Sequence, residues 1–338
     1  MSFDLYRLPR FPLANLPTPL QEASRLREAL GGPAKCPRIL IKRDDLTGLA
    51  FGGNKVRKLE MLVGDALVRG ADTLITTGAV QSNHARATAA AAVVAGLRAI
   101  LVLESADMCP PVQGNLLLDR LLQADVRFVP KDGDTAKAME TVADEVRAAG
   151  GNPYVIPIGG SSPSGAAGYL TMTLELKVQL AAMGASPSRL YFASGSRGTQ
   201  AGIVLGARVF DMPYEIYGVL VSKSRPETEA RALSIANEAA ELVGSDVRLN
   251  SADLANVDGY FGEAYAIPTP EGDAAVLLLA RTEAIFLDPT YTGKSMSALI
   301  DHIQTGQLGP DETVVFIHTG GTPAIFAHAD RLSELAKA

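Results

Sequence analysis

The chain has 338 residues and a formal net charge of −6 at pH 7, with 47% hydrophobic and 20% charged residues. This balance is typical of a globular protein and excludes a chain too polar to bury a core. The length favours two lobes over one, and the absence of a basic stripe excludes nucleic acid as a partner.

Short strand-like apolar runs alternate with helical patterns along the chain. The runs are residues 73–77, 99–103, 126–129, 154–158, 190–193, 215–221 and 314–318. Helical patterns cover residues 82–96, 115–123 and 135–149, and a further one follows residue 202. Because strands that alternate with helices form parallel sheets covered on both faces, the sequence predicts an α/β fold.

Two segments rich in glycine and serine, 48–54 and 159–168, interrupt the periodic pattern. We interpret them as crossings between two lobes. One lobe then comprises residues 1–53 and 163–338, and the smaller lobe comprises residues 54–162. Ligands of open α/β sheets bind at the carboxyl ends of strands and between lobes, so we expect the active site where the crossings meet.

The cysteines and histidines give no sign of a metal site. Cys36 and Cys109 form no Cys-x-x-Cys pair, and two cysteines make no disulfide framework, so a cytoplasmic setting is predicted. The four histidines show no i, i+4 pairing, so no metal is expected. The longest apolar stretch, residues 85–97, is too short to span a bilayer, and no membrane partner is expected.

An unusual group of cations opens the helical pattern that begins near Asn54, whose side chain is suited to cap it. Lys55, Arg57 and Lys58 fall in the first turn, where the helix dipole disfavours positive charge. Lys55 and Lys58 share one face, so each should lower the pKa of the other. A lowered pKa suits Schiff-base chemistry, because the neutral amine is the nucleophile. The alternative is an exposed basic helix start.

Polar side chains follow the strand-like run 73–77. Ser82 and Asn83 open an alanine-rich helix, where either could act as the N-cap. They could equally lie beside a ligand at the carboxyl end of the strand. The residues alone leave both interpretations open.

A loop of small polar residues joins the run 190–193 to a helix. Its glycines match neither the dinucleotide G-x-G-x-x-G pattern nor a nucleotide P-loop. Backbone N–H groups in such a loop, with a helix dipole behind them, favour a single phosphate. The predicted phosphate loop consists of Ser194, Gly195, Ser196, Arg197, Gly198 and Thr199. For Arg197, contact with phosphate and exposure to solvent both remain open.

Three turns near the C-terminal end carry further candidates. Tyr265 and Tyr291 lie in turns rich in glycine and proline, where a tyrosine is either half-buried core or a substrate contact. Thr319 follows the run 314–318 and precedes two glycines, and it could bond a ligand or only the turn.

Taken together and in this order, the motifs resemble one group of enzymes. The segments 17–20 and 41–45, the Lys55 segment, the phosphate loop and residues 318–321 resemble the fold type II, tryptophan-synthase-β-like family of pyridoxal-phosphate enzymes. Within it, the match is to the branch of 1-aminocyclopropane-1-carboxylate (ACC) deaminase, D-cysteine desulfhydrase and L-cysteate sulfo-lyase. The resemblance covers nearly the whole chain and implies a two-lobed, three-layer parallel-sheet fold, pyridoxal 5′-phosphate as the cofactor and a homodimer.

The resemblance also implies roles for the candidate residues. Lys55 would carry the cofactor as a Schiff base and act as the catalytic base. The loop 194–199 would bind the cofactor phosphate, with help from Lys58, and Asn83 would hold the phenolic oxygen. The substrate-facing positions would be Ser82, Tyr265 and Tyr291.

Two departures from the deaminase pattern bear on the substrate, which the resemblance implies is a small amino acid. ACC deaminases typically carry Glu and Leu at the positions of Thr292 and Thr319. Hydroxyl neighbours would leave the cofactor's pyridine nitrogen largely unprotonated, which suits β-elimination better than ring opening. D-Cysteine elimination to pyruvate, hydrogen sulfide and ammonia is therefore the leading hypothesis, ahead of L-cysteate cleavage and ACC deamination. A non-catalytic cofactor- or nucleotide-binding protein and a nucleotide-dependent oxidoreductase are the alternatives from other classes.

Overall fold

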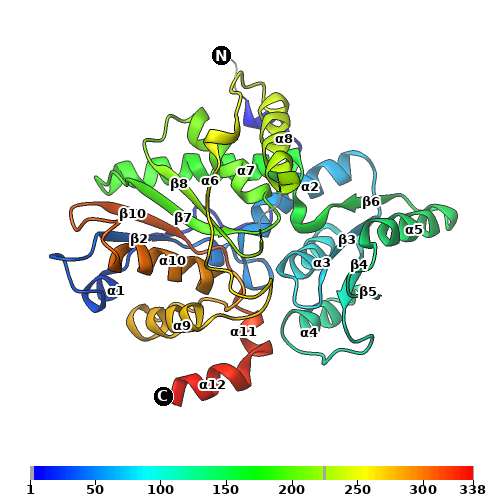
Figure 1. The fold of residues 1–338 in the computed structure, drawn as a ribbon. Coiled ribbons are helices and arrows are strands. Elements are labelled where there is room, and N and C mark those ends of the chain that lie inside the picture. The colour runs from blue at the N-terminus through cyan, green and yellow to red at the C-terminus, as the bar shows by residue number, and fades with distance from the viewer. Residues whose placement is uncertain (1–3, 224–225, 338) are drawn as a thin grey trace.

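The computed structural model describes residues 4–223 and 226–337, and two sheets organise them (Figure 1). The four-stranded sheet has the order β5-β4-β3-β6 and is parallel throughout the described residues. Its strands are β3 (Thr73–Ala79), β4 (Arg98–Ser105), β5 (Asp125–Pro130) and β6 (Pro153–Ile156).

The six-stranded sheet, counted over the same residues, has the order β1-β2-β10-β7-β8-β9. The predicted parallel pairing is confirmed for the described strands, with one antiparallel exception, the pairing of β1 with β2 at the edge of this sheet. The strands are β1 (Leu20–Glu22), β2 (Arg38–Lys42), β7 (Arg189–Ser194), β8 (Glu215–Leu220), β9 (Ala255–Val257) and β10 (Thr313–Ile317).

Helices cover both faces of each sheet. In β10, Val314 and Phe316 pack toward one helix layer, whereas Val315 and Ile317 pack toward the other. This alternation follows from the two-residue period of a strand. The first layer is α1 (Ser24–Ala29), α9 (Pro270–Glu283) and α10 (Thr292–Gln304), and the second is α6 (Pro163–Ala182), α7 (Gly198–Val209) and α8 (Pro226–Leu242).

The four-stranded sheet is covered in the same way. Ile75 packs with α5 on one face, and its neighbour Leu74 packs with α2 and α3 on the other. The covering helices are α2 (Asn54–Val68), α3 (Asn83–Ala95), α4 (Gly114–Leu121) and α5 (Thr135–Ala148). The chain ends in α11 (Ala324–Ala327) and α12 (Ala329–Lys337). Within the described residues, no helix is both long enough and apolar enough to cross a membrane.

The sequence predicted every strand of the four-stranded sheet and three of the six in the other, with boundaries that differ by a few residues. The segment 159–168 is only partly a loop, because α6 already begins at Pro163. All four-stranded-sheet residues fall between positions 73 and 156, and the six-stranded sheet draws on both ends of the chain. The exact lobe boundaries, 54 and 162, remain a prediction.

A buried ion network joins α2 to α6. Arg57 donates to Asp44 Oδ1 at 2.8 Å and to Glu175 Oε1 at 3.1 Å, and Tyr169 donates to Asp44 Oδ2 at 2.9 Å. Gly168 permits this close approach, since a Cβ there would lie 2.2 Å from the Arg57 carbonyl oxygen. The network fixes the helix that carries Lys55 against the six-stranded-sheet side of the molecule.

Candidate active site

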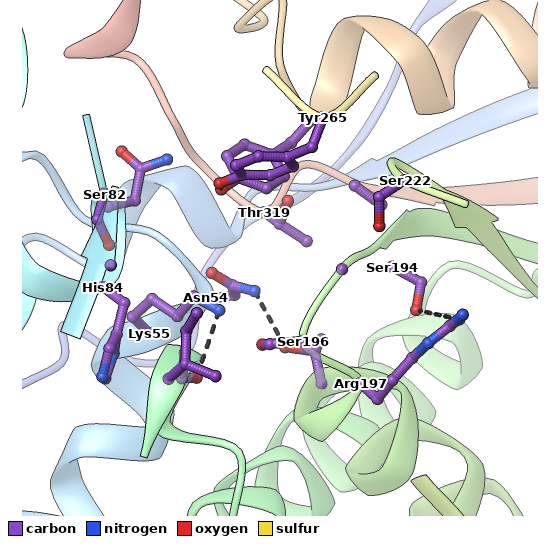
Figure 2. Close-up of a pocket in the computed structure, with 18 of the residues that line it drawn as sticks. Asn54, Lys55, Ser82, His84, Ser194, Ser196, Arg197, Ser222, Tyr265 and Thr319 are labelled. Atoms are coloured by element: carbon purple, nitrogen blue, oxygen red, sulfur yellow. Dashed lines mark hydrogen bonds between the residues drawn. The ribbon is translucent and has the colours of Figure 1, made fainter. Parts of the chain in front are cut away.

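A cavity of about 350 Å³ lies where the carboxyl ends of strands from both sheets meet. The ends of β3 and β4 and the segment after β6 form one side, and the ends of β7, β8 and β10 form the other. Figure 2 shows Lys55, Ser82 and His84 facing Ser194, Ser222 and Thr319 across it. Most of the predicted site residues are therefore brought together.

Lys55 lies in the first turn of α2 and lines the cavity. Its Nζ donates to the Gly159 carbonyl oxygen at 3.4 Å, and Lys58 Nζ donates to the same oxygen at 3.1 Å. Burial lowers the pKa of the Lys55 amine to about 8. Burial, and secondly the charge of Lys55, hold the pKa of Lys58 well below its ordinary value. The sequence predicted that each lysine lowers the pKa of the other. This effect of a neighbouring charge is present at Lys58, whereas the pKa of Lys55 is lowered by burial.

The start of α2 differs from the expectation for Asn54. Gly53 occupies the N-cap position, and the Asn54 side chain instead donates to Thr199 Oγ1 at 3.0 Å. The Asn54 backbone N–H donates to the Thr319 carbonyl oxygen at 2.9 Å. Asn54 therefore ties the lysine-bearing helix to the phosphate loop and to the turn after β10, rather than capping the helix with its side chain.

The phosphate loop joins β7 to α7 as predicted. Ser194, Gly195, Ser196, Arg197 and Thr199 line the cavity. Gly198 is the first residue of α7, and a Cβ there would lie 2.9 Å from Lys58 Nζ. A buried amine thus stands beside the N-terminus of a helix, a combination that favours an anion.

Arg197 does not face solvent, so the alternative of an exposed side chain is excluded for this residue. It is 5% exposed, with a backbone φ of +69°, and its Nη1 donates to Asn256 Oδ1 at 3.0 Å and Gln200 Oε1 at 3.1 Å. Figure 2 shows the side chain extending toward Ser194 on the side of the loop away from Lys55. Through these hydrogen bonds the guanidinium group stabilises the phosphate loop from the side away from Lys55.

Ser82 combines both interpretations offered for it. Its Oγ accepts from the Ala85 backbone N–H at 3.1 Å, so it is the N-cap of α3, and it also lines the cavity. Asn83 lines the cavity beside it, and its Oδ1 accepts from Asn115 Nδ2 at 2.9 Å. Asn115 was not predicted, because its contact with the site depends on the packing of α4 against α3.

The two tyrosines meet at the opposite wall. The hydroxyls of Tyr265 and Tyr291 are hydrogen-bonded to each other, and their ring centroids lie 5.9 Å apart. Burial raises the pKa of both, and for Tyr291 the charge of a Tyr265 phenolate would raise it further. Both hydroxyls are therefore protonated at neutral pH, and because one donates to the other, one O–H of the pair is left to donate to a ligand.

The two threonines have different surroundings. Thr319 lines the cavity, on a turn that His318 fixes by accepting from the Gly320 N–H at 3.2 Å. Thr292 is fully buried and is absent from the cavity wall. Its hydroxyl donates to Asp288 Oδ1 at 2.7 Å and accepts from the Asp288 N–H at 2.8 Å. The Thr292 hydroxyl thus makes a local contact at the start of α10, and its position beside the cofactor ring stays a prediction.

Four wall residues were not predicted, namely Glu104, Ile158, Gln200 and Ser222, whereas Gly159 lies in the crossing 159–168 that was expected near the site. Ser161 also contributes from behind the wall, since its Oγ donates to Ser196 Oγ at 2.8 Å. The glycine-rich segment at 159–160 was a usable signal for this part of the site. A Cβ on Gly159 would lie 2.1 Å from Ser196 Oγ and 3.3 Å from Lys55 Nζ.

Comparison with known proteins places this site in a family. Curated relatives named D-cysteine desulfhydrase include one from Salmonella choleraesuis, 43% identical over 96% of this chain and 97% of the relative. Another, from Yersinia enterocolitica, is 42% identical over 97% and 98%.

Solved structures agree with this placement. A crystal structure described as an ACC deaminase homologue superposes with a TM-score of 0.89 at 38% identity, over 98% of this chain and 97% of that one. Threonine deaminase from Solanum lycopersicum, at 17% identity and a TM-score of 0.65, covers 99% of this chain and 86% of its own and shares the fold. Residues 12–320 match the family described as pyridoxal-phosphate dependent enzyme. The chain therefore belongs to the fold type II family of pyridoxal-phosphate-dependent enzymes.

Proposed function

We propose that this protein is a carbon–sulfur lyase that converts D-cysteine and water into pyruvate, hydrogen sulfide and ammonia. Relatives that carry the name D-cysteine desulfhydrase align over nearly their whole length with this chain. The observation that carries the choice of a thiol over a sulfonate is the charge of the cavity wall.

The cavity residues fit the cofactor on three observations. A buried amine whose pKa is lowered to about 8 is a suitable partner for an aldehyde. The loop 194–199 lies at the N-terminus of α7 and lines the cavity, and the Lys58 amine lies beside Gly198 of this loop, an arrangement that favours a bound phosphate. Asn83 presents an amide to the same cavity for the phenolic oxygen. We assign the phosphate to Ser194–Thr199 and Lys58, and the ring surroundings to Asn83 and Thr319.

A sulfonate substrate would bring a second negative charge and would require a cation on the wall. Among the described residues of the wall, the candidates are Lys55, Arg197 and His84. Lys55 serves the cofactor, and Arg197 is directed toward Asn256 and Gln200. Burial, followed by the two lysines, holds the pKa of His84 well below its ordinary value, so it is neutral. A thiol leaving group needs none of these charges, which favours cysteine over cysteate.

In the reaction, bound pyridoxal phosphate supplies the electron sink that stabilises negative charge at Cα. Lys55 Nζ removes the Cα proton, and the Cβ–S bond breaks with the electron pair leaving on sulfur. Tyr265 and Tyr291 keep their hydroxyl protons because the pKa of each is raised, and since one hydroxyl donates to the other, the second hydroxyl of the pair donates a hydrogen bond to the departing sulfur. Ser82, at the N-terminus of α3, orients the substrate. Hydrolysis of the remaining three-carbon unit gives pyruvate and ammonia.

Product analysis with three substrates tests this function. The purified protein is incubated with D-cysteine, L-cysteate or ACC, and sulfide, sulfite and 2-oxobutyrate are measured. We expect sulfide from D-cysteine at a rate at least tenfold above the release of either other product. Sulfite release from L-cysteate as the main reaction, or no turnover of any substrate, would contradict the proposal.

Borohydride reduction followed by peptide mapping tests the role of Lys55 independently of turnover. The cofactor mass should appear on the peptide that contains Lys55 and disappear in Lys55→Ala. Lys177→Ala, which changes an exposed lysine on α6, is the matched control and should retain both labelling and activity. The homodimer implied by the resemblance and the cytoplasmic setting stay proposals, the first open to light scattering of the purified protein.

A further inference from the structure

The amide of Asn83 is held by one neighbour in a single orientation. Its Oδ1 accepts from Asn115 Nδ2 at 2.9 Å, so its NH₂ end is the end that remains for the cavity. None of the described residues accepts a hydrogen bond from that NH₂ group, because Asn115 donates to the oxygen of the amide. The NH₂ group is therefore placed to donate to an oxygen of a ligand bound in the cavity.

The orientation of Asn115 is fixed by a group that cannot rotate. Asn115 Nδ2 also donates to the backbone carbonyl oxygen of Gln81 at 2.9 Å. Because a backbone carbonyl only accepts, the NH₂ end of Asn115 must face it, and the same end then faces Asn83. The direction of donation thus runs from Asn115 to Asn83 and from Asn83 into the cavity.

The position of Asn115 is equally constrained. It is fully buried as the second residue of α4, and its backbone N–H donates to Gln81 Oε1 at 2.8 Å. Gln81 Nε2 donates in turn to the Gln113 carbonyl oxygen at 3.0 Å. Gly114, with φ of +55°, makes this close approach possible, since a Cβ would lie 2.4 Å from Gln81 Oε1.

The amide of Asn115 is not the side chain that would stabilise the fold most at this position. Asn115 Oδ1 is buried and has no hydrogen-bond partner among the described residues. An unpaired buried acceptor is a cost to folding, which an apolar side chain of the same size would avoid. Retaining an amide here is explained if its NH₂ group is needed to orient Asn83.

We infer that Asn115 is a positioning residue, which orients Asn83 so that its NH₂ group donates to the phenolic oxygen of the cofactor. This inference rests on the proposed function for the placement of that oxygen. It predicts that changes at Asn115 alter cofactor affinity and the visible absorption of the bound cofactor, and that they act through Asn83.

The test titrates pyridoxal 5′-phosphate into cofactor-free protein and records the dissociation constant and absorption spectrum. In Asn115→Asp, carboxylate oxygens face Asn83 Oδ1, so the Asn83 amide should turn its oxygen to the cavity. We expect at least a tenfold weaker dissociation constant and a displaced absorption maximum. Asn152→Asp, at an exposed asparagine of the same sheet region, is the matched control and should match wild type.

A double-mutant cycle separates positioning from a general structural role, and it remains informative if Asn115→Asp does not fold. Asn115→Leu should weaken cofactor binding in the wild-type background and have no further effect in the Asn83→Ala background. Additive losses in the cycle, or an Asn115→Asp protein within twofold of wild-type affinity with an unchanged spectrum, would overturn the inference. The proposed function is judged separately, by sulfide release from wild type alone.

Discussion

The pH dependence of cofactor capture offers a direct test of the environment of Lys55. The perturbation is a change of pH from 6 to 10 in a cofactor-free preparation mixed with pyridoxal 5′-phosphate. Only the neutral amine attacks an aldehyde, so the capture rate follows the neutral fraction of Lys55. Burial of the amine lowers its pKa from 10.5 to about 8, which moves this titration into an accessible range.

The size of the effect follows from that shift. At pH 7, an amine of pKa 8 is about one-tenth neutral, whereas an ordinary lysine is neutral in about one molecule in 3,000. The structure therefore predicts a neutral fraction about 300-fold above that of an exposed lysine. The rate should rise about tenfold per pH unit below 8 and level off above it.

Stopped-flow absorbance at the wavelength of the bound cofactor measures the rate. The rate with free Nα-acetyl-lysine in the same buffers, divided by the neutral fraction of its own ordinary amine, corrects for ionisation of the cofactor itself. After this correction the enzyme curve should have its midpoint near pH 8. A corrected rate that climbs steadily up to pH 10 would refute the idea that burial lowers the pKa of Lys55.

The same shift predicts how stability depends on pH. The unfolded lysine still binds its proton between pH 8 and 10.5, whereas the folded one has lost it. Because the unfolded state then binds more protons, this residue makes the stability of the cofactor-free protein rise with pH across that window. Lys55→Met should reduce this slope in urea unfolding series, and an unchanged slope would argue against the assignment.

Three substitutions probe the framework around the site. Arg57→Met leaves the buried Asp44 carboxylate without its guanidinium partner and should cost about 3–5 kcal/mol in urea unfolding; a loss below about 1 kcal/mol would contradict this. Gly159→Ala places a Cβ 2.1 Å from Ser196 Oγ at a φ of +67°, so cofactor titration should show at least tenfold weaker binding. Unchanged affinity would contradict the idea that the close approach of Gly159 to the phosphate loop is needed for cofactor binding. Thr292→Val should lower the free energy of unfolding by about 1–3 kcal/mol in thermal unfolding and leave the cofactor spectrum unchanged. An altered spectrum would instead support a contact between Thr292 and the cofactor ring.

The strands that the sequence predicted share a local signal. Each is an apolar run bounded by turn residues, and these runs need no knowledge of their partners. The short strands β1 and β9, three residues each, carry too little periodicity to be recognised. The start of α6 was misread because its glycines indicate a loop, whereas Gly168 is required by the approach of the Arg57 carbonyl from another helix.

The site was predictable to the extent that its residues lie in motifs at strand ends. Ser82, the phosphate loop and Thr319 follow strands that were recognised, and all of these residues except Gly198 line the cavity. Asn115 and Ser161 act through contacts between elements that are distant in the sequence, and no local pattern reveals such contacts. Thr292 differs from these residues, because its hydroxyl bonds Asp288 in the same motif, and its place beside the cofactor ring stays a prediction.

The three cations at the start of α2 explain why a binding site forms there. Arg57 is neutralised by Asp44 and Glu175, and this pairing anchors the helix. Among the described residues, no carboxylate lies within 4.0 Å of Lys55 or Lys58, and both amines share the Gly159 carbonyl oxygen. Burial without a counterion lowers the pKa of both amines, so a bound anion would stabilise the charged form of Lys58, and the neutral form of Lys55 is the one that can react with an aldehyde. In the proposed site, a phosphate beside Lys58 and an aldehyde at Lys55 would meet both conditions in one ligand, so the same helix turn would serve affinity and chemistry together.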